Sequence, residues 1–82
     1  MKAEDLAKLE EVFRVVLDLP EGSDVSSIRR LTTRRWDSLA HVSMVAAIES
    51  ELGVQLDTSS SERLTSFQAA KLLIEERLDS HQ

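Results

Sequence analysis

The chain has 82 residues, of which 41% are hydrophobic and 30% charged, with a net charge of −5 and no cysteine. This length suits one small domain, and we expect a single domain over residues 1–82 with an ordered core over about 4–78. The lack of cysteine excludes disulfides, thiolate metal sites and a thiol nucleophile. The acidic balance argues against nucleic-acid binding and favours partners with basic surfaces. So small a domain has little room for an enclosed active site, and we expect no enzyme.

The first residues of the chain are charged and lead into no apolar signal run, which predicts a cytoplasmic protein. No apolar stretch approaches the roughly 20 residues that span a bilayer, so stable membrane insertion is not expected. A monomer is the default expectation.

The first predicted helix is amphipathic and about four turns long. Its apolar residues recur at helical spacing: Leu6, Leu9, Val12, Phe13, Val16 and Leu17. We expect Pro20 to stop this helix. Residues 25–36 have no sustained period and are predicted to form a long loop, with one turn around 27–31.

A second helix is predicted from Asp37-Ser38 to about Leu52, where Gly53 supplies a left-handed end residue. Its expected apolar stripe is broad: Leu39, Val42, Val45, Ala46, Ile48 and Leu52. A short turn follows within 59–64. The last helix is expected to start with a capping box of Thr65 and Gln68, to bury Phe67, Ala70, Leu73, Ile74 and Leu78, and to fray over 79–82. No run alternates as a strand does, so we predict an all-α four-helix bundle of three main helices, one short helix and a long first loop.

The tandem Asp37-Ser38 is the most informative pair, since both residue types are good N-caps. If Asp37 is the cap, contributing about 1 kcal/mol, then the Ser38 hydroxyl is free and points to solvent, and Leu39 anchors the turn in the core. A hydroxyl at a helix start lies where backbone N–H groups and the helix dipole favour an anion. The position therefore suits a phosphodiester, although the choice of cap stays open at this point.

The Asp37-Ser38-Leu39 motif, with the helix that follows it, resembles the acyl carrier protein family. The segment from Leu64 to Ala70 resembles the family's short third helix running into its fourth. The resemblance covers roughly Leu6 to Leu78. It implies that Ser38 carries 4′-phosphopantetheine, with Asp37 and Leu39 completing the motif.

The family resemblance also implies that the thiol of the arm holds acyl groups as thioesters and that catalysis lies with partner enzymes. The implied partners are a phosphopantetheinyl transferase and acyl-loading, acyl-transfer or condensing enzymes. The residues expected to shelter part of the acyl group in the core are Val42, Ala46, Leu56, Leu64 and Ala70. The residues expected to face partners are Arg34, Arg35, Trp36, Ala40, His41, Ser43, Ala47, Glu49 and Ser50.

The chain departs from the family's pattern in its charge distribution. Residues 29–36 hold four arginines and no acid, whereas the segments before and after are net acidic. These four (Arg29, Arg30, Arg34 and Arg35) form either a solvated loop or a contact for a partner's acidic patch or a coenzyme A phosphate. We therefore expect a dedicated carrier for one pathway that makes a fatty acid, a polyketide or another lipid or secondary metabolite.

Alternative interpretations accompany these assignments. An aminoacyl or peptidyl carrier is disfavoured because the glycines common before its serine are missing, and an unmodified helical interaction module is the alternative of another class. Ser38 as a hydrolase nucleophile lacks the required elbow motif. His41 is expected on the surface near the arm, His81 is expected to be inert, and no ligand spacing supports a metal. Trp36 either anchors the loop or flanks the arm.

Overall fold

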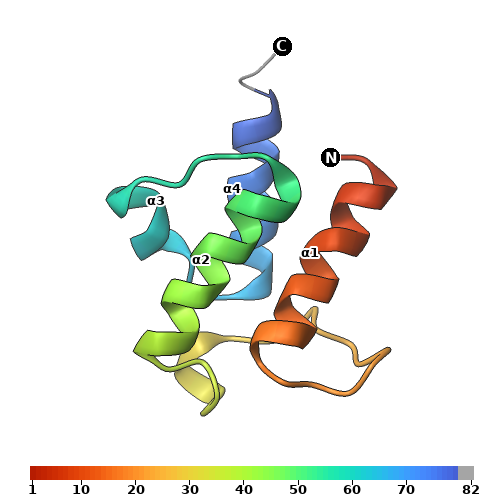
Figure 1. Ribbon diagram of the computed structural model, residues 1–82, viewed down its shortest axis with the longest axis vertical. Coiled ribbons are helices and arrows are strands. Elements are labelled where there is room, and N and C mark those ends of the chain that lie inside the picture. Colours follow the sequence, from red (N-terminus) through yellow and green to blue (C-terminus); the bar gives the residue numbers. More distant parts are fainter. Residues whose placement is uncertain (80–82) are drawn as a thin grey trace.

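The computed structural model describes residues 1–79 and consists of four α-helices and one 3-10 turn. They are α1 (Ala3–Val16), η1 (Arg30–Thr32), α2 (Ser38–Leu52), α3 (Thr58–Arg63) and α4 (Phe67–Asp79). Helices α1 and α2 pack most extensively against each other, and α4 runs behind them (Figure 1). The predicted all-α bundle with one short helix and a long first loop is confirmed, and within residues 1–79 the only β pairing is a single bridge between Arg29 and Ser66. Of the residues expected to fray, Asp79 is the last residue of α4, and residues 80–82, with His81, lie outside the described part.

Helix α1 buries the face that its apolar period predicts. Leu9, Val12 and Phe13 are buried, and Leu17 directly after the helix is fully buried. The helix ends at Val16 and not at Pro20. Asp18 adopts a left-handed conformation with φ of 54°, and the Leu19 N–H donates to the Arg14 carbonyl at 2.8 Å. This 6→1 bond is the one that closes a Schellman motif, so the chain turns before the proline acts.

Helices α3 and α4 each begin after a residue whose side chain caps the helix. Helix α3 is capped by Asp57, whose carboxylate accepts the Ser60 N–H at 2.8 Å. Helix α4 is capped by Ser66, whose hydroxyl accepts the Ala69 N–H at 3.0 Å. The predicted capping box of Thr65 and Gln68 is therefore wrong, because the Gln68 amide reaches across to the Ser26 carbonyl at 3.1 Å.

The core gathers around an aromatic cluster that ties three segments together. The Phe13 ring in α1 makes edge-to-face contacts with Trp36 of the long loop, at 5.3 Å between centroids, and with Phe67 of α4, at 5.1 Å. Such pairs stabilise by about 0.5–1.5 kcal/mol beyond the burial of their area. The long loop is therefore fixed to the bundle at its far end, immediately before α2 begins.

Candidate functional site

The start of α2 has one cap, and that cap is Asp37. Its backbone is extended, its carboxylate accepts the Ala40 N–H at 2.8 Å, and its carbonyl accepts the His41 N–H at 2.9 Å. The alternative in which Ser38 caps the helix is excluded by this geometry. The Gly53 end of the helix is also as predicted, with φ of 65° and its N–H donating to the Glu49 carbonyl.

Ser38 is the first residue of α2 and is exposed. Within residues 1–79, its hydroxyl makes no hydrogen bond, and the N–H groups of Ser38 and Leu39 have no acceptor. The first turn of α2 carries no acidic residue. Free N–H groups and the positive end of the helix dipole favour negative charge at such a place.

The exposed face of α2 is apolar close to Ser38, contrary to expectation. Leu39 is 77% exposed and Val42 67% exposed, and Ala46 is also exposed. Ile48 is buried as the predicted stripe requires, and Met44, which that stripe does not include, is buried as well. At 3.6 residues per turn, Val42 and Ala46 lie about 160–200° around the helix from Met44. The predictions that Leu39 anchors the core and that Val42 and Ala46 belong to it are wrong.

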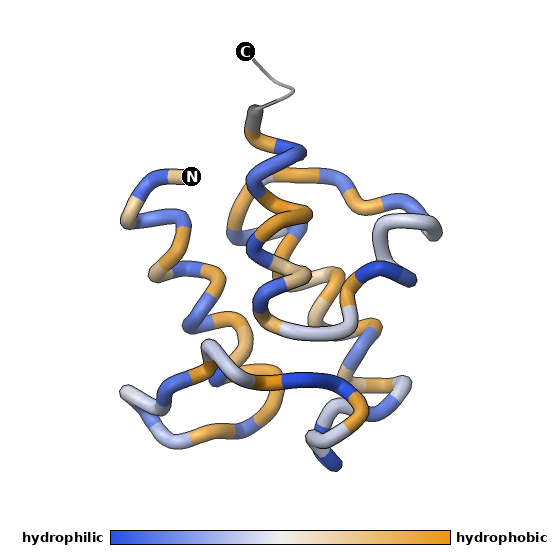
Figure 2. Tube along the Cα trace, turned by 180° about the vertical axis from the view of Figure 1, so that it is seen from behind, coloured by the Kyte–Doolittle hydropathy of each residue, from blue (hydrophilic) through white to orange (hydrophobic). Residues whose placement is uncertain are grey.

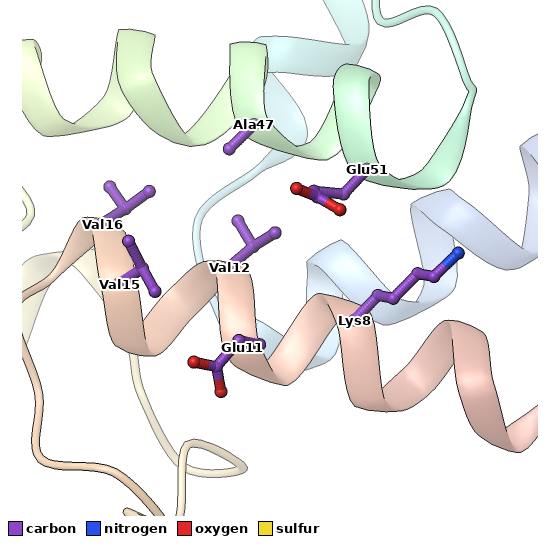
Figure 3. A pocket seen from close by; sticks show the side chains of 7 residues that line it. All are labelled: Lys8, Glu11, Val12, Val15, Val16, Ala47 and Glu51. Atoms are coloured by element: carbon purple, nitrogen blue, oxygen red, sulfur yellow. The ribbon is translucent and has the colours of Figure 1, made fainter.

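The other three residues expected to shelter an acyl group, Leu56, Leu64 and Ala70, are buried. A separate apolar hollow of about 210 Å³ lies between α1 and α2. Figure 3 shows Val12, Val16 and Ala47 around it, with Glu51 nearby. On α2, this hollow is lined by Ala47 and Glu51 of the C-terminal half, away from Ser38 at the start of the helix.

Trp36 is 2% exposed, so the expectation that it faces partners is wrong and the loop-anchor interpretation is correct. Its indole N–H donates to Nδ1 of His41 at 3.1 Å. Because an indole nitrogen only donates, the His41 proton lies on Nε2, which is 3.0 Å from the Ser61 carbonyl. His41 is half-buried and links the loop before α2 to α3.

Two further residues expected to face partners make contacts within the chain. The Arg35 guanidinium bonds the Asp18 carboxylate at 3.1 Å and carbonyl groups at the end of α1. The half-buried Glu49 accepts the Leu56 N–H at 2.9 Å, which holds the link between α2 and α3. Arg34, Ser43 and the remaining member Ser50 are exposed, whereas Ala40 and Ala47 are half-buried against the core.

Two carboxyl groups have perturbed titration, and neither belongs to the start of α2. The Ser60 backbone and hydroxyl hydrogen bonds lower the pKa of Asp57, and Arg77 adds to this. Hydrogen bonds from Ser26 lower the pKa of Asp24 in the same way. Asp57 therefore serves as the cap of α3, and Asp24 closes the turn that leads to Ser26. In the described part of the chain, no three His, Cys, Asp or Glu side chains gather where a metal ion could bind.

A four-helix bundle that presents an exposed serine at the start of its second main helix, with its hydroxyl free of hydrogen bonds within residues 1–79, has the architecture of an acyl-carrier-type domain. Comparison with known proteins agrees. The chain is 30% identical over 78 residues to acyl carrier protein 4, chloroplastic, of Cuphea lanceolata, a match that covers 95% of this chain and 56% of that protein. It is 31% identical over 74 residues to acyl carrier protein 3, chloroplastic, of the same plant, covering 90% and 52%.

The chain belongs to the acyl carrier protein family. It spans about half the length of the curated relatives it matches. No protein-family model matches it. None of the helices in residues 1–79 has the length and apolar character needed to cross a membrane.

Proposed function

We propose that this chain is a phosphopantetheine-dependent acyl carrier and that Ser38 is the attachment residue. The observation that carries the proposal is the placement of Ser38 behind the Asp37 cap: exposed, first in α2, and with its hydroxyl unbonded among the described residues. A serine that capped the helix itself would have its oxygen engaged with the backbone. Here that task falls to the neighbouring aspartate.

The surroundings of Ser38 fit a phosphodiester. Its own N–H and that of Leu39 are unpaired within residues 1–79, and the positive end of the α2 dipole adds a favourable field for an anion. The carboxylate of the adjacent residue, Asp37, accepts the Ala40 N–H. When attached, 4′-phosphopantetheine would supply the thiol that holds an acyl group as a thioester; the chain itself would hold the phosphate and present the arm.

The partners proposed are a phosphopantetheinyl transferase and enzymes that load, transfer or condense acyl groups. An enzyme that takes Ser38 to its active site would also cover the exposed side chains of Leu39 and Val42. We propose a dedicated pathway that makes a fatty acid, a polyketide or a related metabolite, with the chain acting as a single-domain monomer. We propose a cytoplasmic location for this chain, whereas the relatives are named chloroplastic.

Co-expression with a broad-specificity phosphopantetheinyl transferase, followed by intact-mass measurement, tests the proposal. We expect the mass of one phosphopantetheine to be added, lost in Ser38→Ala and kept in Ser43→Ala. Ser43 is a matched control because it is also an exposed serine of α2. An unchanged mass of the wild-type chain, with a transferase that modifies a known carrier in parallel, would contradict the proposal and favour an unmodified interaction module.

A further inference from the structure

The basic loop, defined as residues 28–34, carries three arginines without partners. Within the described chain, the guanidinium groups of Arg29, Arg30 and Arg34 make neither an ion pair nor a hydrogen bond. Arg35 differs, because its guanidinium is bonded to Asp18. The loop therefore exposes positive charge that the fold itself does not use.

The backbone of the basic loop is held in place. The Arg30 N–H donates to the Thr65 carbonyl at 2.9 Å, and the Phe67 N–H donates to the Ile28 carbonyl at 2.9 Å. Trp36 follows the loop, is buried and packs against the Phe13 ring of α1, so it fixes the chain just after the loop. A surface that is already ordered loses less conformational entropy on binding, which favours recognition.

Leu31 lies within the basic loop, and its side chain is 99% exposed. Beside it is an open hollow of about 820 Å³, lined by Arg29, Arg30, Trp36 and Thr65 among others. Figure 2 shows strongly hydrophilic and hydrophobic segments next to each other in the loop at the end opposite the C-terminus. An exposed apolar side chain next to arginines is typical of a protein-binding surface, where arginine is enriched.

We propose that the basic loop docks a protein partner that presents carboxylates around an apolar recess, with Leu31 entering the recess. Charge complementarity favours this partner, since opposite charges steer association and fix orientation. A membrane fits less well, because the chain outside residues 28–34 has eight more acidic than basic residues and would be repelled by anionic lipid.

The inference rests on the proposed function for the identity of the partner, an enzyme that acts on the group carried at Ser38. Figure 1 shows η1 and the start of α2 at the same end of the molecule. A partner bound to the basic loop would therefore reach Ser38 as well. Its acidic surface would contact the loop and leave the acidic remainder of the chain in solvent.

The test uses a photoreactive benzophenone amino acid at position 31 of the full chain, in both its unmodified and phosphopantetheine-loaded forms. After cross-linking in an extract of cells that express the chain natively, the bound protein is identified, and its affinity for the chain is measured in purified form. The charge-reversal variant is Arg29→Glu with Arg34→Glu, two exposed residues. The matched control is Lys2→Glu with Lys8→Glu, which makes the same change of charge at exposed positions of another face.

We expect cross-links to peptides rich in Asp and Glu, and an affinity that falls about tenfold in the arginine variant but not in the lysine control. Replacing the partner's cross-linked carboxylates by lysine should restore binding of the arginine variant. Trp36 fluorescence checks that each variant is folded, since it is the only tryptophan and is buried.

Three results would overturn the inference: equal affinity of wild type and arginine variant; saturable binding to vesicles of 30% phosphatidylserine but not to neutral vesicles; or coenzyme A binding at the loop that needs its 3′-phosphate. Loading of Ser38 is measured separately. Failure of loading contradicts the proposed function alone, whereas normal loading with an unaffected partner contradicts only the docking surface.

Discussion

The sequence predicts that Leu39 and Leu64 both lie in the core, but replacing each by alanine should change the free energy of unfolding very differently. Leu64 is fully buried between α3 and α4, whereas Leu39 at the start of α2 is 77% exposed. Replacing Leu64 by alanine removes buried methyl groups and leaves a cavity that the packed surroundings fill only partly. Replacing Leu39 removes side-chain atoms that are already mostly in water.

For Leu64→Ala we expect a loss of about 3–5 kcal/mol of unfolding free energy. A domain of this length has a total of about 4–12 kcal/mol, so the substitution takes a large share of it. The midpoint of thermal unfolding should fall by about 12 °C or more. For Leu39→Ala the change should stay within about 0.5 kcal/mol.

Urea unfolding followed by far-UV circular dichroism measures both variants, and Leu64→Met serves if Leu64→Ala does not fold. The methionine keeps the volume of the site, so its cost should stay below about 1.5 kcal/mol. Equal urea midpoints for Leu64→Ala and Leu39→Ala would refute the burial on which this reasoning depends. A large loss in Leu39→Ala would place that side chain in the core.

Two further predictions concern hydrogen bonds. Trp36→Phe keeps an aromatic ring against Phe13 but removes the indole N–H that His41 accepts, and it should cost about 1 kcal/mol in urea unfolding; an unchanged midpoint would mean that water replaces this bond without loss. Asp57 should make stability pH-dependent, because its folded pKa lies below the ordinary 3.8. Its contribution is complete above that value and is lost as pH falls through the folded pKa. Urea midpoints between about pH 5 and pH 2 should therefore fall less in Asp57→Asn than in wild type; equal slopes would contradict this.

The local signals near the helix starts were enough to predict the site. Asp37 and Ser38 are neighbours in sequence, and a cap depends only on the three or four residues that follow it. The same is true of Gly53, whose left-handed conformation ends α2 as predicted. The candidate attachment residue and the bounds of α2 could thus be derived without tertiary information.

Helix α1 was predictable for a similar reason. Its apolar residues occupy one face and its charged residues the other, so its buried face follows from a 3.6-residue period alone. Leu9, Val12 and Phe13 are buried as that period requires. The end of the helix was less predictable, because Asp18 takes a left-handed conformation that glycine usually occupies.

The sequence by itself determined an all-α chain and the helix that begins at Ser38, because these depend on short-range hydrogen bonds and periodicity. The sequence left open whether Asp37 or Ser38 caps that helix, and the structure assigns the cap to Asp37. Only the tertiary structure decided which face of α2 is buried, since that helix has apolar residues on most sides and its period does not select one of them. Packing against α1 turned Met44 and Ile48 inward and left Leu39 and Val42 in solvent. Contacts between distant segments likewise separated Arg35, which is bonded to Asp18, from the arginines of the basic loop.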